Sequence, residues 1–253
     1  MRICVIIPVY NSEKMIADVL KSVLQHAENV IVVNDGSSDG TFDVLKNFFG
    51  ITLVSYTKNR GKGHALQCGF RKAAEMKFTH VVTMDADGQH LATDIAMLAQ
   101  AAEKQPGAII VGARKFDNPN MPQGNVFANN FSNFWFRMQT GKRLPDTQTG
   151  FRIYPLQTVG KMRIFTSRYE AELEILVRSA WRNIPIVSQA INVYYPPGNE
   201  RVSHFRAGKD FFRISVLNTV LCFLAVIYGY PSRLIRKMVH RLTQKRNNLC
   251  QSV

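Results

Sequence analysis

Residues 80–90 read HVVTMDADGQH, an apolar run that ends at Met84 and is followed at once by Asp85 and Asp87. The run has the length and the β-branched content of a buried strand. Gly88 and two polar side chains follow the acids, so the chain turns here. The stretch therefore predicts a strand whose carboxyl end presents two carboxylates.

The same pattern recurs on both sides of this stretch. Apolar runs alternate with segments of helical period and short connections, which predicts an α/β fold with a mostly parallel, doubly wound sheet. Ligands of such sheets bind beyond the carboxyl ends of the strands. Strands are expected at 3–9, 30–33, 51–56, 80–84, 108–112 and 184–192, and helices at 13–25, 41–48, 63–76, 91–104 and 168–182.

The alternation lapses after Phe116. The aromatic residues near 127–138 are spaced as in an amphipathic helix, and a polar turn with a short strand follows at 146–154. We expect the aromatic stripe of this helix to face the core, with a lipid-facing lid as the alternative.

Asp85 and Asp87, one residue apart at a strand end, can converge on one cation. Mg²⁺ and Mn²⁺ prefer such oxygen ligands and are usually shared with substrate phosphates. The cation would neutralise charge that develops on a diphosphate leaving group. Alternatively both acids only cap the next helix, although two acids with Gln89 and His90 exceed what a cap needs.

Two more motifs follow predicted strands: PVYN at 8–11 and NDGSSDGT at 34–41. Gly36 and Gly40 permit tight turns, and Ser38 or Asp39 can cap the next helix. An Asp in such a turn can also accept hydrogen bonds from a ribose or a base. The motif by itself would equally suit a surface turn.

Taken together, IPVYN, DGSSDGT, NRGKGHA (59–65) and DADGQH resemble, in order and spacing, the inverting family-2 glycosyltransferases. Within these the chain is most similar to polyprenyl-phosphate sugar synthases of the dolichyl-phosphate mannose synthase type, over about residues 1–191. The resemblance implies a GT-A type nucleotide-diphospho-sugar transferase fold and a UDP- or GDP-sugar donor. The implied acceptor is lipid-linked, with polyprenyl phosphate favoured and a glycan or lipid hydroxyl as the alternative.

The resemblance also assigns residues to the site. Thr149 stands where D-x-x-S-G-F-R has Ser, which keeps a hydroxyl. The implied donor-binding residues are Pro8, Tyr10, Asn11, Asp35, Asp39, Lys62, Asp85 and Arg114; the metal ligands are Asp85, Asp87 and Gln89; the acceptor side is Asp146, Thr149, Gly150, Phe151 and Arg152.

Glu170 completes the catalytic candidates, beside Asp87 and Arg114. It lies one turn before Leu173 on the apolar stripe of the helix expected at 168–182, so it should face inward as a general base or as a cap. Glu172 and Glu174 lie off that stripe and are expected to be solvated. A lipid phosphate is already an anion and needs no base, whereas a hydroxyl acceptor does.

The C-terminal part concentrates positive charge. The net charge is +14, and residues 201–246 contain ten Lys or Arg against one acid, Asp210. The nearly uncharged run 214–230 is slightly short of the roughly 20 residues that span a bilayer. We expect a catalytic domain at 1–200 and, at 201–253, a helical segment associated with the anionic inner face of a membrane. Residues 214–230 could form a short span, one limb of a membrane-embedded hairpin, an interfacial helix or a buried core helix. The segment does not clearly reproduce the paired membrane hairpins of some synthases.

Other classes fit less well. The four cysteines are scattered, and the apolar run 3–9 is short and contains Pro8, so a reduced, cytoplasmic protein without a signal peptide is expected. Leu66 stands where a G-x-G-x-x-G fingerprint needs glycine, and no P-loop is present. A nucleotidyltransferase would begin with a glycine-rich basic loop. A non-catalytic membrane- or nucleic-acid-binding module would leave the strand-end acids unexplained, and we expect no nucleic-acid partner.

Overall fold

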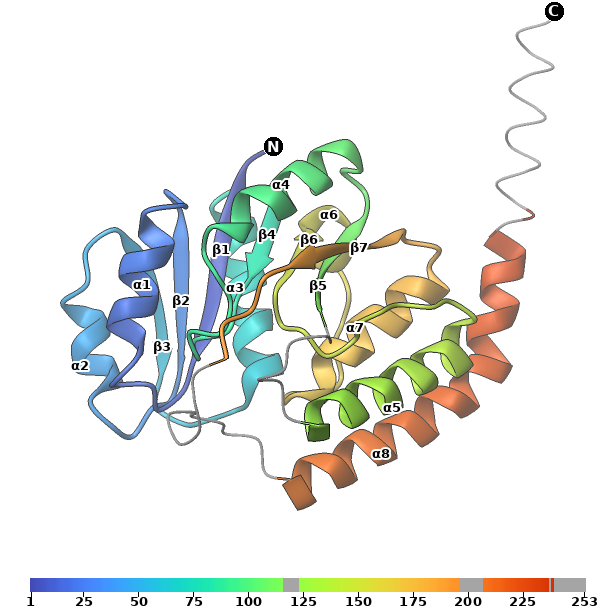
Figure 1. Ribbon diagram of the computed structural model, residues 1–253. Coiled ribbons are helices and arrows are strands. Elements are labelled where there is room, and N and C mark those ends of the chain that lie inside the picture. The colour runs from blue at the N-terminus through green and yellow to red at the C-terminus, as the bar shows by residue number, and fades with distance from the viewer. Residues whose placement is uncertain (116–122, 196–206, 237, 239–253) are drawn as a thin grey trace, which may run out of the picture.

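The computed structural model describes residues 1–115, 123–195, 207–236 and 238, and its centre is a seven-stranded sheet flanked by helices (Figure 1). The strands lie in the order β3-β2-β1-β4-β6-β5-β7. The elements are β1 (Ile3–Val9), α1 (Ile16–Leu24), β2 (Val30–Asp35), α2 (Thr41–Lys46), β3 (Ile51–Tyr56), α3 (Lys62–Glu75), β4 (His80–Thr83), α4 (Asp94–Lys104), β5 (Ile109–Arg114), α5 (Gln123–Thr140), β6 (Arg152–Pro155), α6 (Leu156–Val159), α7 (Glu170–Trp181), β7 (Ile186–Ile191), α8 (Ala207–Leu224) and the π-helix η2 (Ala225–Gly229).

The predicted α/β class and mostly parallel sheet are confirmed. β1 pairs in parallel with both β2 and β4, and β5 pairs in parallel with β7. Only β6 among the described strands runs antiparallel, between β4 and β5. Since the chain leaves β1 toward β2 and β3 and later returns to β4 on its other side, the topological switch point lies between β1 and β4.

Element ends differ from the prediction by a few residues. Helix α1 begins at Ile16 rather than at residue 13, because the Ser12 carbonyl accepts hydrogen bonds from the amides of Met15 and Ile16 and holds a turn there. Helix α4 likewise begins at Asp94, three residues later than expected. The short helix α6 was not predicted.

The core lies on both faces of the sheet, as strand alternation requires. On one face Ile6 and Ile31 pack with apolar residues of α3 and α7. On the other face Val5 and Val30 pack with residues of α1 and α4. The α1 contribution is the stripe Ile16, Val19, Leu20 and Val23, which has the i, i+3, i+4, i+7 spacing of a helix face.

Helix α5 contradicts one expectation, because its aromatic stripe faces outward. Phe127 is 70% exposed and Phe134 is 54% exposed, whereas Asn129 and Ser132 are buried. The polar face turns inward because it has partners there: the Asn129 side chain donates to the Pro145 carbonyl. The described part of the helix therefore leaves Phe127 and Phe134 exposed, while Phe136 of the same helix is fully buried in the core.

Helix α8 packs against α5 and α7 at the opposite end of the molecule from β3 (Figure 1). Leu221 and Ala225 join the main apolar cluster, so the segment shares the core of the sheet domain. Gln139 Nε2 donates to Asn218 Oδ1 over 2.9 Å, and both side chains are buried. The helical stretch Phe212–Arg236 is long and apolar enough to cross a membrane, and 22% of its most apolar window is buried.

We predict that Asn218→Leu lowers the free energy of unfolding by about 1–3 kcal/mol, since it removes the nearest acceptor of the buried Gln139 side chain and leaves only the longer contacts to the 218 carbonyl and Cys222. The double variant with Gln139→Leu should recover most of this loss, because both polar groups are then gone. Urea denaturation of the two variants measures the difference. A single variant as stable as the parent would show that α8 is not docked on α5.

Candidate active site

The loop after β4 carries the two predicted carboxylates at the switch point of the sheet. Asp85 packs against Gly150, where an added Cβ would lie 2.4 Å from Asp85 Oδ2. The Thr83 hydroxyl donates to the Gly150 carbonyl over 2.7 Å, which fixes the two loops together. Asp87 Oδ1 accepts the Gln89 amide over 3.0 Å. The acids therefore hold a defined place on the 85–90 loop, and neither caps α4.

Lys62, the first residue of α3, lies between two acids. Its Nζ is 2.6 Å from Asp85 Oδ1 and 2.8 Å from Glu172 Oε2. All three side chains are largely shielded, with 15%, 25% and 8% of their surfaces exposed for Lys62, Asp85 and Glu172. The bridge joins the start of α3, the loop after β4 and the first turn of α7.

Burial and charge move the two aspartates in opposite directions. Burial alone would raise the pKa of Asp85, but the adjacent Lys62 ammonium holds that pKa below its usual range. Burial, followed by the Asp85 charge, raises the pKa of Asp87. Among the described residues Asp87 takes part in no ion pair within 4 Å. A partly buried aspartate that lies beside a second aspartate and has no described ion pair suits a bound cation.

The donor set fits Mg²⁺ or Mn²⁺ shared with a substrate. The described residues contain no group of three or more His, Cys, Asp or Glu side chains that could enclose a metal. Mg²⁺ is commonly bound by only one or two carboxylates, with phosphates and water completing its shell. The recorded Gln89 contacts are those of its main chain, with Asp87 and with the Tyr194 amide, so its side chain as a ligand stays a prediction.

Asp35, predicted for the nucleoside pocket, is occupied by protein donors. Its carboxylate is 3% exposed and accepts the Asn59 side chain and the amides of Arg60 and Gly61 over 2.8–3.0 Å. Gly61 has a φ of +97°, which favours glycine. Asp35 thus shapes the loop that carries Lys62.

The loops after β1 and β2 are tied together by their polar side chains. Asn11 Oδ1 accepts the Ser38 amide over 2.8 Å, and the Asn11 amide donates to the Ser37 hydroxyl. Asp39 accepts the amide of Thr41, the first residue of α2, and also the Glu13 amide; the N-cap residue of α2 is Gly40 rather than the predicted Ser38 or Asp39. Burial by itself would raise the pKa of Asp39, but these hydrogen bonds hold that pKa below its usual value. Pro8 and Tyr10 are partly exposed beside them.

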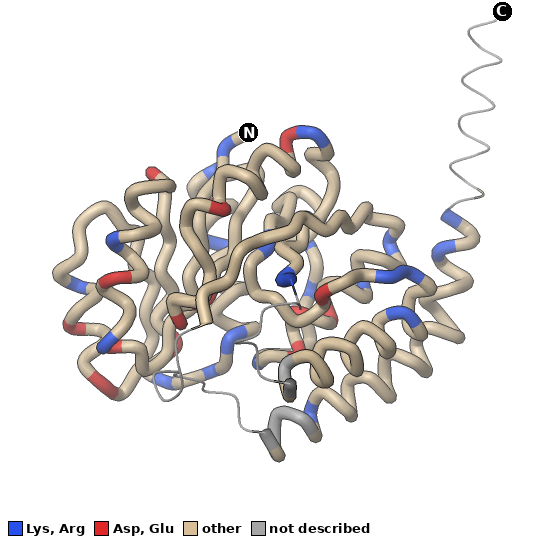
Figure 2. The backbone as a smooth tube through the Cα atoms, in the orientation of Figure 1, with Lys and Arg blue, Asp and Glu red and all other residues tan. Residues whose placement is uncertain are grey.

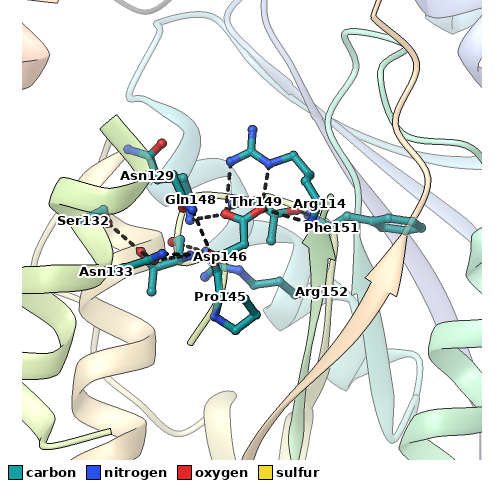
Figure 3. Close-up of polar contacts among 11 residues, drawn as sticks. Arg114, Asn129, Ser132, Asn133, Pro145, Asp146, Gln148, Thr149, Phe151 and Arg152 are labelled. Atoms are coloured by element: carbon teal, nitrogen blue, oxygen red, sulfur yellow. Dashed lines mark hydrogen bonds and ion pairs between the residues drawn. The ribbon is translucent and has the colours of Figure 1, made fainter. Parts of the chain in front are cut away.

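Asp146 is the centre of a second cluster (Figure 3). Its side chain is fully buried, and its two oxygens accept from Nε and Nη2 of Arg114 over 2.6 and 3.0 Å. It also accepts the amides of Gln148 and Thr149. The pair is bidentate, which orients the guanidinium strongly. Burial alone would lower the pKa of Arg114, but Asp146 raises it, so Arg114 stays charged.

The predicted acceptor-side residues are interior ones. Thr149 is 1% exposed, and Phe151 and Arg152 are fully buried. Arg152 donates to the carbonyls of Thr147 and Glu172 over 2.9 Å. These side chains support the site from the interior, and Arg152 adds positive charge near Asp85 and Glu172.

The acids of α7 correct the sequence analysis in part. Glu170 is 8% exposed, which confirms that it faces inward. Glu172 and Glu174, expected to be solvated, are 6% and 2% exposed. Glu174 accepts the amides of Phe165 and Thr166 and pairs with Arg178.

Glu172 is a site residue that its position off the apolar stripe did not predict. Apolar residues lie between the three acids and directly after them, at Ala171, Leu173, Ile175, Leu176 and Val177, so they occupy every side of this part of the helix. A helix that is apolar on every side is buried on every side. That composition was the available signal, because it leaves no solvated face for Glu172 or Glu174.

Comparison with known proteins agrees with this geometry. The model of the family described as glycosyl transferase family 2 matches residues 4–159. The UDP-N-acetylglucosamine–dolichyl-phosphate N-acetylglucosaminyltransferase of Methanococcus voltae is 30% identical over 216 residues, 76% of this chain and 86% of that protein. The dolichyl-phosphate beta-glucosyltransferase of Homo sapiens is 27% identical over 251 residues, 85% of this chain and 76% of that protein.

Among solved structures, glucosyl-3-phosphoglycerate synthase from Mycobacterium tuberculosis, in complex with Mn²⁺, UDP and glucosyl-3-phosphoglycerate, superimposes with a TM-score of 0.66. Its sequence identity is 18%, and the match covers 88% of this chain and 79% of that one. The likeness confirms the predicted GT-A type fold.

Proposed function

Because this chain belongs to glycosyl transferase family 2, we propose that it is an inverting enzyme that moves a sugar from a UDP- or GDP-sugar to polyprenyl phosphate. The observation that carries the proposal is the position of Asp85 and Asp87 at the carboxyl end of β4, beside the switch point. In doubly wound sheets that position binds nucleotides.

The donor residues proposed from the sequence surround this point. Pro8, Tyr10 and Asn11 follow β1, and the Asp35 and Asp39 loop follows β2. Asp35 already accepts three hydrogen bonds from residues 59–61, so we assign it the support of this loop, which we place at one wall of the nucleoside pocket. The partly exposed ring of Tyr10 is then the candidate for direct contact with the nucleoside.

We assign Asp85 and Asp87, with Gln89 beside them, to hold Mg²⁺ or Mn²⁺. When bound, the cation would supply positive charge against the diphosphate that leaves the sugar. Arg114 would add a second, permanently charged group, and Asp146 fixes its orientation. Asp146, Thr149, Gly150, Phe151 and Arg152 hold the acceptor side of the site in place, mainly from the interior.

Relatives that act on dolichyl phosphate support a phosphate acceptor. A phosphate oxygen is already anionic and can attack without a proton acceptor, so Glu170 need not act as a base. The alternative acceptor is a hydroxyl of a glycan or lipid, for which buried Glu170 would take the proton.

We propose that residues 1–200 form the catalytic domain and 201–253 a segment on the inner, cytoplasmic face of a membrane. Of this segment the structure describes the helical residues 207–236 and 238, and the boundary at residue 200 lies outside the described residues. One side of α8 is fixed to α5 and α7, while Phe223 of α8 and Val226 and Ile227 of η2 are 57–69% exposed. The described stretch 212–236 carries three arginines and no acid, in contrast to the mixed charges around the sheet (Figure 2). This arrangement favours a helix that lies on an anionic surface.

Asp87→Ala should lower turnover by about 10³-fold, since charge stabilisation by a metal contributes several kcal/mol. The fold should persist, because the recorded hydrogen bond of this side chain is with its own loop. Release of nucleoside diphosphate with and without Mn²⁺ measures the effect. Asp43→Ala, at an exposed acid paired with Lys46, is the control. A variant near the parent rate at saturating Mn²⁺ would remove Asp87 from the mechanism.

Glu170→Gln should cost less than about tenfold in turnover, below the 10²–10⁴-fold typical of a lost base. Single-turnover transfer to polyprenyl phosphate gives the rate, with the exposed Glu75→Gln as control. A thousandfold loss with donor and metal binding intact would point to a hydroxyl acceptor, with Glu170 as its base.

Phe223→Glu should weaken binding to vesicles that contain phosphatidylglycerol by about tenfold or more, from the 1.5–3 kcal/mol of a buried Phe side chain. Phe49→Glu, at a 92% exposed residue between α2 and β3, should leave binding unchanged. Deletion of residues 211–253 should also release the protein, but it would remove Leu221 and Ala225 from the core as well. Equal binding of Phe223→Glu and the parent would contradict the membrane assignment.

A further inference from the structure

The backbone that carries Lys62 is fixed. An added Cβ at Gly61 would lie 2.5 Å from the Ser167 carbonyl oxygen, and one at Gly63 would lie 2.4 Å from the Ala171 Cβ. The His64 amide donates to the same Ser167 carbonyl over 3.0 Å. The start of α3 is therefore pressed against the start of α7, and any change of position at Lys62 belongs to its flexible side chain.

The Lys62 ammonium group can pair with either of two carboxylates. Asp85 and Glu172 both lie within 2.8 Å of its ammonium group. Glu172 Oε1 is buried and has no hydrogen-bond partner. Glu172 can thus hold Lys62 with both oxygens once Asp85 has taken another cation, and the buried orphan oxygen would gain a donor.

Lys62 and a divalent cation compete for Asp85. Two cations on one carboxylate repel each other, and the repulsion is strong where water is excluded. A nucleotide diphosphate changes this balance, because its negative charges attract both cations at once. Metal binding without the donor should then be weak, and metal binding with the donor should be tight.

We propose that Lys62 is the resident counter-ion of Asp85 and thereby makes metal binding conditional on the nucleotide diphosphate. The inference rests on the proposed function, since it takes Asp85 and Asp87 as the metal site. Lys62 acts as a positioning residue that sets the order of binding, metal after or together with the donor. At a low metal concentration, the site would accordingly bind no metal until the donor is present.

The test measures Mn²⁺ affinity directly, from the electron paramagnetic resonance signal of free Mn²⁺, alone and with saturating UDP or GDP. For the parent we expect the nucleotide to tighten Mn²⁺ binding by a factor near the upper end of the usual 5–150-fold range. Lys62→Met should bind Mn²⁺ alone at least about tenfold more tightly than the parent, and the coupling factor should fall by about tenfold.

Three further variants separate this role from a structural one. Lys62→Arg keeps the charge and should restore the weak binding of Mn²⁺ alone. Glu172→Gln leaves Asp85 as the only charged partner of Lys62 and should weaken Mn²⁺ binding, the opposite sign to Lys62→Met. Lys72→Met removes the same charge from an exposed residue of α3 and should change nothing. If Lys62→Met does not fold, Glu172→Gln and Lys62→Arg carry the test.

A result that contradicts the role of Lys62 differs from a result that contradicts the metal site. If the parent binds Mn²⁺ with UDP or GDP, and Lys62→Met neither gains affinity for Mn²⁺ alone nor loses coupling, Lys62 is not the counter-ion and the metal site stands. If Glu172→Gln tightens Mn²⁺ binding, the competition is likewise overturned. If the parent binds no Mn²⁺ with either nucleotide, the metal site falls, and this inference falls with it.

Discussion

The Lys62 ammonium lies 2.6 Å from Asp85 and 2.8 Å from Glu172, and these contacts bring together the start of α3, the loop after β4 and the first turn of α7 in one buried charged centre. Buried acids cannot remain close together without compensation. Lys62 supplies the compensating positive charge to Asp85 and Glu172. Fully buried Arg152 donates a hydrogen bond to the Glu172 carbonyl, and Arg114 balances the charge of Asp146. Asp87 is left beside this centre without a described ion pair, and we assign it to the cation that arrives with the substrate. The rest of the site follows from this uneven balance.

Much of the fold followed from patterns that the sequence displays directly. Strand–helix alternation predicted the sheet, and the strand-end acids predicted where its site lies, because both signals are local in the chain. The antiparallel direction of β6 was not predictable in this way, since it depends on pairing between β4 and β5. The ends of α1 and α4 were also missed, as they depend on turns such as the one at the Ser12 carbonyl.

The surroundings of several side chains could not be predicted because they depend on tertiary contacts. Glu172 was expected in water, but Lys62 lies 110 positions before it in the chain and meets it only in the fold. The aromatic stripe of α5 was expected in the core, yet Asn129 and Ser132 have partners in the 145–147 loop that turn the polar side inward. Asp35, whose place in the nucleoside pocket stays a prediction, also holds the loop before α3 through Asn59, Arg60 and Gly61, which the sequence did not indicate. In each case the residue type indicated a position of interest, but the sequence did not indicate which residue its side chain contacts in the fold.

The central claim is transfer with inversion to a phosphate oxygen. Nuclear magnetic resonance of the product formed from polyprenyl phosphate and an α-linked UDP- or GDP-sugar with Mn²⁺ tests it most directly. The account predicts a new phosphodiester between the sugar C1 and the lipid phosphate, with a β anomeric configuration, and one nucleoside diphosphate released per product. A sugar attached to a hydroxyl, with the lipid phosphate remaining a monoester, would contradict the acceptor, and an α-linked product would contradict the inverting mechanism.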